Sequence, residues 1–166
     1  MAPAAALSAS IQYVTLGIDR EVFAIDVALV QEILDHCPIS RIPNAPPALM
    51  GMIDVRHRTV PVIDLRTKLG LPPVPPSLST RIVVLDVPLH GRRVLLGLLA
   101  DRVYEVTPLA DHPMEDAPDI GVRWRSQFIR GVGRQGDRFV IVLDVSHLFG
   151  VDETMLLAPA ASAVAG

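Results

Sequence analysis

Short apolar runs separated by turn residues are the feature that most constrains the fold of this chain. Each run is six to eight residues long and rich in Val, Ile and Leu, a pattern typical of β-strands. Several runs are apolar without alternation, which predicts strands covered on both faces. Turn-forming residues at 17–20, 88–91 and 135–137 predict three hairpins. The six runs are 11–16, 21–27, 60–65, 81–87, 94–100 and 138–145.

Helical signals are few and short. Asp26 is placed to cap a turn that reaches Glu32, one turn is expected at 47–50, and a C-terminal helix is expected at 152–157. The chain contains fifteen prolines, including Pro72-Pro73 and Pro75-Pro76, which argues against a helical bundle. The regular alternation of strand and helix that marks a parallel α/β sheet is also missing. The sequence therefore predicts an all-β protein with small helical additions.

An internal repeat suggests that the fold contains two copies of one unit. Segments 51–70 and 131–150 align without a gap, and a weaker similarity relates 23–33 to 96–106. Each copy is too small to bury its strands well alone, so the two are expected to share a core, and the groove between them is a natural binding site. Independent convergence of two ordinary hairpins remains the alternative. Identical pairs in the stronger repeat are Gly51/Gly131, Arg58/Arg138, Val60/Val140, Val62/Val142, Asp64/Asp144 and Gly70/Gly150.

Asp64 and Asp144 occupy equivalent places in the two copies. Paired carboxylates can act as an acid and a base. The same residues can also cap the helical turns that follow them, and the caps are favoured because a structural role recurs in both halves of a duplication. A phosphate-binding glycine loop leads into a helix. Gly131 and Gly133 instead precede a turn and a strand, so they are not expected to form such a loop.

Composition excludes several classes of function. The net charge of −3 and a pI near 5.9 give no electrostatic basis for binding nucleic acid. Cys37 is the only cysteine, so a disulfide framework and a CxxC redox motif within the chain are excluded, and a reducing compartment fits best. The first ten residues do not resemble a signal peptide, and the sequence contains no apolar run long enough to span a bilayer. We therefore expect a cytoplasmic protein without membrane insertion.

The sequence offers little evidence for catalysis or ligand binding. Its five histidines lack the spacing of metal ligands, so neither a metal nor a cofactor is expected. Cys37 lies beside His36, but adjacent side chains rarely face each other, which favours an inert thiol. Two rival functions remain open: a hydrolase that uses Cys37, His57 and Asp64, and a sensor with a small molecule inside a barrel.

Several segments together resemble the CheW family of chemotaxis coupling proteins. These are FAIDVALVQEI (23–33), RIPNAPPALMGMIDVRHRTVPVIDLR (41–66), VLLGLLADRVYEV (94–106) and FIRGVGRQGDRFVIVLDVSHL (128–148), in the family's order. The resemblance implies two small SH3-like five-stranded β-barrels packed together, with short helices and a C-terminal helix. It assigns 11–150 to a CheW-like domain, with subdomains near 11–82 and 83–150 and an exchange of strands between them left open. The remaining parts are a flexible tail at 1–10, and a short helix with a flexible tail at 151–166.

The resemblance also implies partners and a binding groove. Members of this family bind the regulatory domain of the histidine kinase CheA and the cytoplasmic tips of chemoreceptors, without a cofactor. One departure concerns the family's N-L-R-G turn, which reads Asp54-Val55-Arg56-His57 here, so the turn lacks its glycine. The residues that match the receptor-facing groove are Val30, Glu32, Gly51, Arg56, Gly97, Val103 and Val106.

The sequence therefore predicts a non-catalytic adaptor that couples chemoreceptors to a CheA-type kinase. It would work in the cytoplasm, at membrane-associated receptor arrays. An adaptor of the same type that serves a non-flagellar pathway, such as twitching or surface sensing, is the alternative.

Overall fold

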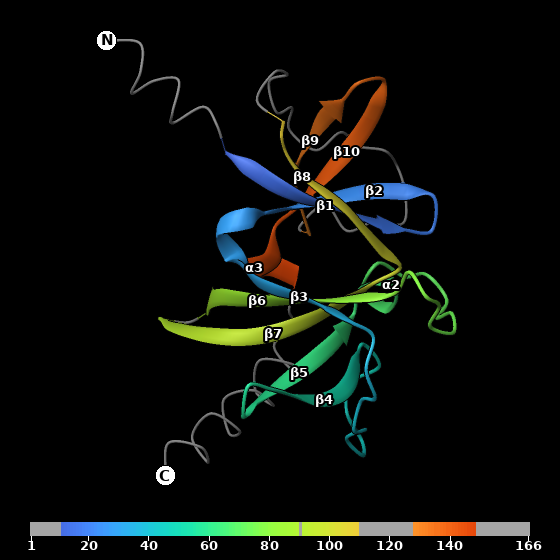
Figure 1. Ribbon diagram of the computed structural model, residues 1–166, viewed down its shortest axis with the longest axis vertical. Coiled ribbons are helices and arrows are strands. Elements are labelled where there is room, and N and C mark those ends of the chain that lie inside the picture. The colour runs from blue at the N-terminus through green and yellow to red at the C-terminus, as the bar shows by residue number, and fades with distance from the viewer. Residues whose placement is uncertain (1–10, 90, 110–127, 149–166) are drawn as a thin grey trace.

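A computed structural model of the protein describes residues 11–89, 91–109 and 128–148 (Figure 1). The expected N-terminal tail at 1–10, and the C-terminal helix and tail at 151–166, lie outside the described residues. The described part of the chain contains two five-stranded sheets and a few short helices, so the all-β prediction is confirmed.

The first sheet lies uppermost in Figure 1 and has the strand order β8-β1-β2-β10-β9. The second sheet lies below it and has the order β3-β6-β7-β5-β4. The strands of the first sheet are β1 (Gln12–Ile18), β2 (Glu21–Asp26), β8 (Arg102–Pro108), β9 (Ile129–Gln135) and β10 (Arg138–Leu143). Those of the second are β3 (Val30–Asp35), β4 (Leu49–Val55), β5 (Arg58–Asp64), β6 (Arg81–Leu89) and β7 (Arg92–Ala100). The helical turns are η1 (Val27–Leu29), α2 (Leu65–Lys68) and α3 (Val145–Leu148).

Within the described residues the chain crosses between the sheets twice, so the first sheet combines two separate segments. β1 and β2 belong to the first sheet, β3 to β7 form the second, and β8 to β10 return to the first. The subdomain boundary expected near 82 falls inside β6, whose neighbours β3 and β7 are both in the second sheet. Sheet membership thus divides the described chain after β2 and after β7.

The two sheets have the same strand order once their strands are matched through the repeat. The repeat aligns the hairpin β4–β5 with β9–β10, and it aligns β2–β3 with β7–β8. Strand β5 pairs in parallel with β7. Its equivalent β10 pairs in parallel with β2, which is the equivalent of β7. This common topology supports the interpretation of two copies that exchange their edge strands β3 and β8.

Each sheet has two edge strands that are joined by isolated contacts and not by a backbone ladder. The described residues contain no backbone pairing between edge strands β8 and β9, or between β3 and β4. The side chains of Glu105 and Gln135 join the first pair of edges, with 2.6 Å between Oε1 and Nε2. An isolated bridge between Ser40 and Met52 joins the chain after β3 to β4, with N···O distances of 2.9 and 2.8 Å. The sheets are therefore barrel-like without a continuous ladder.

Turn chemistry explains the hairpins. The three hairpins predicted from turn residues are confirmed as the antiparallel pairs β1–β2, β6–β7 and β9–β10. Asp19, Gly91 and Gly136 have positive φ angles in these turns, a conformation that Gly and Asp accept at low cost. The predicted caps are also present. Asp64 Oδ1 accepts from the Arg66 amide at 3.1 Å, and Asp144 Oδ1 accepts from the His147 amide at 3.4 Å.

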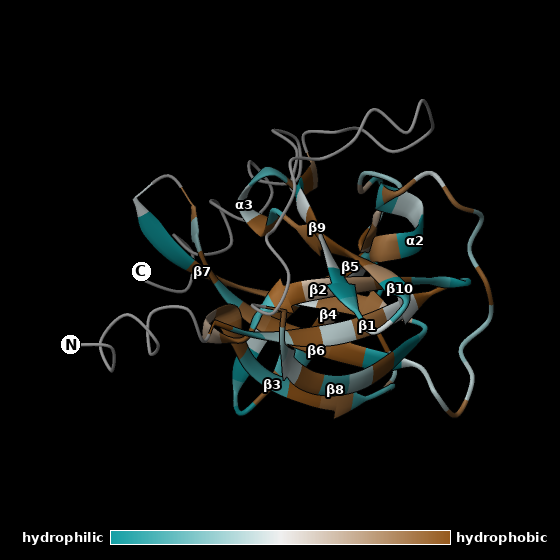
Figure 2. Cartoon of the chain, turned by 90° about the horizontal axis from the view of Figure 1, so that it is seen from above, coloured by the Kyte–Doolittle hydropathy of each residue, from teal (hydrophilic) through white to brown (hydrophobic). Residues whose placement is uncertain are grey.

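Apolar side chains fill three layers. A large cluster lies between the sheets and includes Leu16 and Phe23 from the first sheet and Leu85 and Leu96 from the second. A smaller cluster around Val140 covers the other face of the first sheet, and a cluster that contains Val62 and Ile82 covers the other face of the second. Apolar residues accordingly concentrate in the strands and polar ones near the hairpin ends (Figure 2). Burial on both faces is the reason that the strands read as continuous apolar runs.

Candidate partner-binding surface

The edge strands β3 and β8, one from each sheet, lie on the same side of the molecule in Figures 1 and 2. We call the exposed parts of these two strands, together with the β4–β5 turn, the β3–β8 face. β3 alternates between exposed and half-buried residues, and most residues of β8 are exposed. The face therefore joins one edge of each sheet, which is the region where the repeat predicts a groove.

Three of the predicted groove residues lie together on the second sheet. Val30 begins β3 and packs against the core between the sheets. Glu32 follows on the same strand, and its Oε2 lies 3.1 Å from Nε of Arg56 at the tip of the β4–β5 hairpin. The Arg56 side chain is 79% exposed, so most of it remains available to a partner.

The β4–β5 turn keeps its tight shape without a glycine. Arg56 and His57 have φ angles of 51° and 68°, the left-handed pair that a two-residue type I′ turn requires. The turn directs Arg56 back toward β3, where Glu32 accepts its hydrogen bond. His57 therefore occupies the glycine position of the family's turn with a positive φ and at the cost of local backbone strain.

The two predicted glycines lie inside the second sheet. A Cβ on Gly51 would stand 2.1 Å from the Ser40 carbonyl oxygen, because the chain after β3 crosses directly over this residue. A Cβ on Gly97 would stand 3.0 Å from Cγ2 of Ile82 and 3.3 Å from Cγ2 of Val62. Both glycines permit close approach of neighbouring chain segments, and both are buried. They shape the sheet behind the β3–β8 face and are not part of its surface.

The last two predicted residues lie on β8. Val103 is half-buried against the core between the sheets, whereas Val106 is 51% exposed. The structure thus places Val30, Glu32 and Arg56 on one sheet, and Val103 and Val106 on the neighbouring edge strand of the other. Val30 and Val103 are equivalent in the repeat and have the same half-buried environment.

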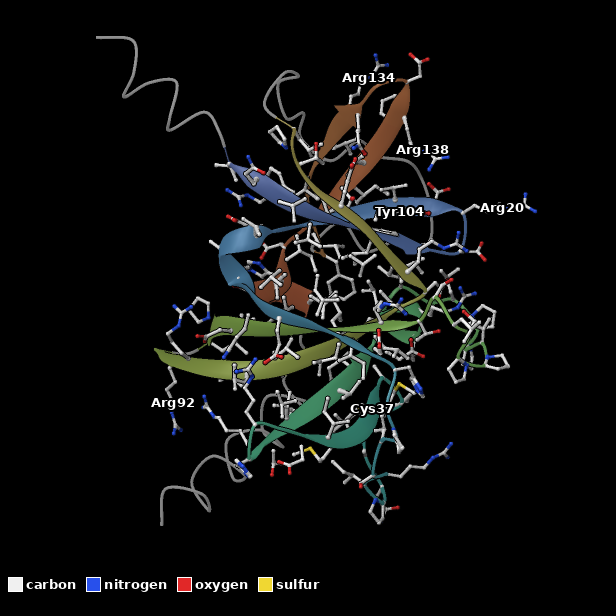
Figure 3. The ribbon with its side chains drawn as sticks, viewed as in Figure 1. Arg20, Cys37, Arg92, Tyr104, Arg134 and Arg138 are labelled. Carbon is white, nitrogen blue, oxygen red and sulfur yellow. The ribbon has the colours of Figure 1, made fainter. Side chains whose placement is uncertain are left out.

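Sequence reasoning missed other exposed apolar residues. Ile33 on β3 is 41% exposed, and Tyr104 on β8 is 47% exposed. The outward positions of β3 are otherwise polar, so an isoleucine among them was the available signal for Ile33. On the first sheet, Phe139 is 56% exposed and the guanidinium of Arg134 lies 4.8 Å from its ring centroid. Figure 3 shows Arg134 and Arg138 extending from the β9–β10 hairpin, away from the second sheet.

The residues of the hydrolase alternative do not form a catalytic triad. His57 precedes the first residue of β5 and Asp64 is its last, and a strand of seven residues spans about 20 Å. The Asp64 carboxylate also accepts hydrogen bonds from the Arg66 amide and from Thr67 Oγ1. Cys37 packs against the apolar cluster on the far face of the second sheet.

The described residues contain neither a candidate metal cluster nor a candidate membrane-spanning helix. Among the residues that the structure describes, no three His, Cys, Asp or Glu side chains gather in a way that could hold a metal ion. No helix within 11–89, 91–109 and 128–148 combines the length and the apolar character needed to cross a membrane.

Comparison with known proteins identifies the family. The family model described as CheW-like domain matches residues 12–153. A protein of Klebsiella aerogenes named chemotaxis protein CheW is 33% identical over 143 residues, which cover 86% of this chain and 82% of that protein. A protein of Treponema pallidum with the same name is 28% identical over 94% of this chain and 92% of that protein.

A solved structure agrees with the sequence comparisons. The crystal structure of scaffolding protein TtCheW from Thermoanaerobacter tengcongensis matches with a TM-score of 0.76 and 26% identity, over 87% of this chain and 95% of that one. The matching family model, the two relatives and the shared fold together show that this chain belongs to the CheW-like domain family.

Proposed function

We propose that this protein is a non-catalytic adaptor that couples chemoreceptors to a CheA-type histidine kinase. Membership of the CheW-like domain family supports the proposal, as do relatives named chemotaxis protein CheW. The partners would be the regulatory domain of the kinase and the cytoplasmic tip of a receptor, and no cofactor is needed. The adaptor would work in the cytoplasm, at receptor arrays, because both partner domains are located there.

The β3–β8 face is the observation that carries the receptor side of the proposal. It combines exposed apolar side chains, Ile33, Tyr104 and Val106, with the Glu32–Arg56 ion pair at its border. Aromatic and aliphatic anchors flanked by arginine are the composition expected of a protein-binding surface. In this proposal Val30, Glu32, Arg56, Val103 and Val106 contact the receptor, and Gly51 and Gly97 maintain the shape of the sheet beneath them.

Coupling requires that binding differ between the states of the kinase. A receptor rearrangement changes kinase activity only if the adaptor binds the two states with different free energies. The proposed adaptor meets this requirement when it contacts receptor and kinase together and a receptor rearrangement changes its binding free energy for one kinase state more than for the other.

The Arg56→Ala variant tests the receptor contact. Arg56 is mostly exposed and its ion pair with Glu32 is a surface pair, so we expect unfolding free energy to change by at most about 0.5 kcal/mol. Pull-downs with a receptor signalling fragment and with a CheA regulatory domain, separately and together, should show loss of the receptor and retention of the kinase.

Arg20→Ala provides the matched control. Arg20 is an exposed arginine in the β1–β2 turn of the first sheet, and its removal should leave both partners bound. Unchanged receptor capture by Arg56→Ala would refute the role given to this arginine. Failure of the unmodified protein to bind either partner would refute the adaptor function itself.

A further inference from the structure

A polar cluster around one buried arginine lies beside the second crossing between the sheets. Arg66, in helix α2, has a side chain that is only 8% exposed. Its Nη1 donates to Asp101 Oδ2 at 2.6 Å and its Nε donates to the Pro72 carbonyl at 2.8 Å. Nη2 lies 3.6 Å from Asp19 Oδ1, and the Asp19 amide donates to the same Asp101 oxygen at 2.7 Å. We call these four residues the Arg66 clasp.

The clasp ties the two sheets together at one point of the chain. Asp19 is in the β1–β2 turn of the first sheet, and Arg66 follows β5 of the second. Asp101 is the single residue between β7 in the second sheet and β8 in the first. Figure 1 places α2 at this junction. A guanidinium with several donors in a rigid plane can hold three segments at once, which a lysine ammonium cannot do with the same geometry.

The clasp is present in only one of the two copies. In the repeat, Ser146 is equivalent to Arg66 and Ala28 is equivalent to Asp101. The other crossing, from β2 to β3, instead passes through η1, where Asp26 accepts from the Ala28 amide at 2.9 Å. A barrel of this topology therefore forms without such a clasp, and the buried ion pair is an addition specific to the junction that begins β8.

The position of β8 follows directly from this junction. Gly17 pairs with Arg102, the first residue of β8, and Leu16 pairs with Val103. A Cβ on Gly17 would stand 2.7 Å from Cγ of Arg102 and 2.9 Å from the Tyr104 hydroxyl, so β8 side chains close tightly over β1. Any displacement of Asp101 therefore moves the start of β8, and with it the residues that β8 contributes to the β3–β8 face.

We propose that Arg66 is a positioning residue for receptor binding: by holding Asp101 against the Asp19 turn, it sets the place of Val103, Tyr104 and Val106 relative to Glu32 and Arg56. This inference rests on the proposed function, because it gives the β3–β8 face its receptor-binding role. Arg66 is buried and makes no receptor contact itself. Its effect is exerted through the start of β8.

Asp101→Asn is the principal test, since it keeps the shape and the hydrogen-bond acceptor while it removes the charge that holds Arg66. We expect receptor-fragment affinity to fall about tenfold, within the range by which residues outside a site alter coupling. Binding of the CheA regulatory domain should stay unchanged, and amide hydrogen exchange should accelerate at 102–104. Arg66→Lys keeps the positive charge but not the planar set of donors. Its loss of receptor-fragment affinity should therefore be smaller than that of Arg66→Met.

Asp86→Asn is the matched control. Asp86 also pairs with an arginine, with Oδ1 3.1 Å from Nε of Arg93, but this pair joins β6 and β7 of one sheet and is exposed. Both affinities should be unchanged in this variant. A folded Asp101→Asn protein that binds the receptor fragment normally would overturn the inference, as would an equal loss of both partners. If the unmodified protein binds no receptor fragment, the proposed function fails, and unaltered exchange at 102–104 in Asp101→Asn would then reject the positioning role separately.

Discussion

At the residue scale, the β4–β5 turn places two residues with strained backbone angles at the border of the β3–β8 face. Arg56 and His57 are adjacent, both carry a Cβ, and both adopt left-handed backbone angles. Such angles cost most residues free energy, because Cβ approaches a backbone oxygen. The turn tolerates this cost since β4 and β5 pair on both sides of it, from Val55–Arg58 to Leu49–Ile63.

Replacing His57 with glycine should relieve this strain. We expect His57→Gly to raise the unfolding free energy by about 0.5 to 1 kcal/mol, because the relief at φ 68° exceeds the extra chain entropy of glycine in the unfolded state. Urea unfolding followed by circular dichroism measures the change. Thr59→Gly, two residues later in strand β5, lacks a positive φ and should lower stability instead. A lower urea midpoint of unfolding for His57→Gly than for the unmodified protein would show that the histidine is stabilising.

At the element scale, an equivalent aspartate caps a helix in each copy of the repeat, but the capping hydrogen bonds differ in number and length. Asp64 is buried, and its two carboxylate oxygens accept from the Arg66 amide at 3.1 Å and from Thr67 Oγ1 at 3.0 Å. Asp144 is half-buried, and its longer bond to the His147 amide measures 3.4 Å, alongside a 2.7 Å contact with His147 Nδ1. The same aspartate therefore begins both helices, but only Asp64 supports a helix that also carries the Arg66 clasp.

The two caps should consequently contribute unequally to stability. We expect Asp64→Ala to lower the unfolding free energy by about 2 kcal/mol and Asp144→Ala by about 0.5 to 1 kcal/mol, the upper and lower parts of the range for such caps. Thermal or urea unfolding of the two variants gives the comparison. Asp64→Asn keeps a capping oxygen and should lose less than Asp64→Ala. Equal losses at the two positions would contradict the asymmetry.

At the scale of the whole molecule, the sheets depend on each other. Leu16 and Phe23 of the first sheet share one cluster with Leu85 and Leu96 of the second. The first sheet also needs strands from both ends of the described chain. Neither sheet can therefore bury its inner face without the other, although all strands of the second sheet are consecutive in the sequence.

The full chain should accordingly unfold in a single cooperative transition. A fragment of residues 30–100 contains the complete second sheet, but its inner face would lose its apolar cover, so we expect no cooperative unfolding from it. Urea titrations followed by far-ultraviolet circular dichroism and by tyrosine fluorescence should coincide for the full chain. Two separate transitions, or a fragment that unfolds cooperatively, would show that the second sheet is an independent subdomain.

Local interactions allowed much of this protein to be predicted from its sequence. The hairpins, the aspartate caps and the all-β class depend on neighbouring residues and on short apolar runs, so they could be predicted from the local sequence pattern. The resemblance to the CheW family names seven groove residues, and the structure places five of them on β3, on β8 or in the β4–β5 turn. Their contact with a receptor stays a prediction.

Only the tertiary structure decided which segments meet. The repeat could not show that β3 and β8 exchange sheets, because a strand's partner is set by packing over long distances in the sequence. Nor could it show that Gly51 and Gly97 are buried beneath the face, since their role depends on Ser40 and Ile82. The Arg66 clasp joins residues 35 and 82 positions apart. Sequence patterns record local preferences, whereas such contacts exist only after the apolar faces of the two sheets have packed together.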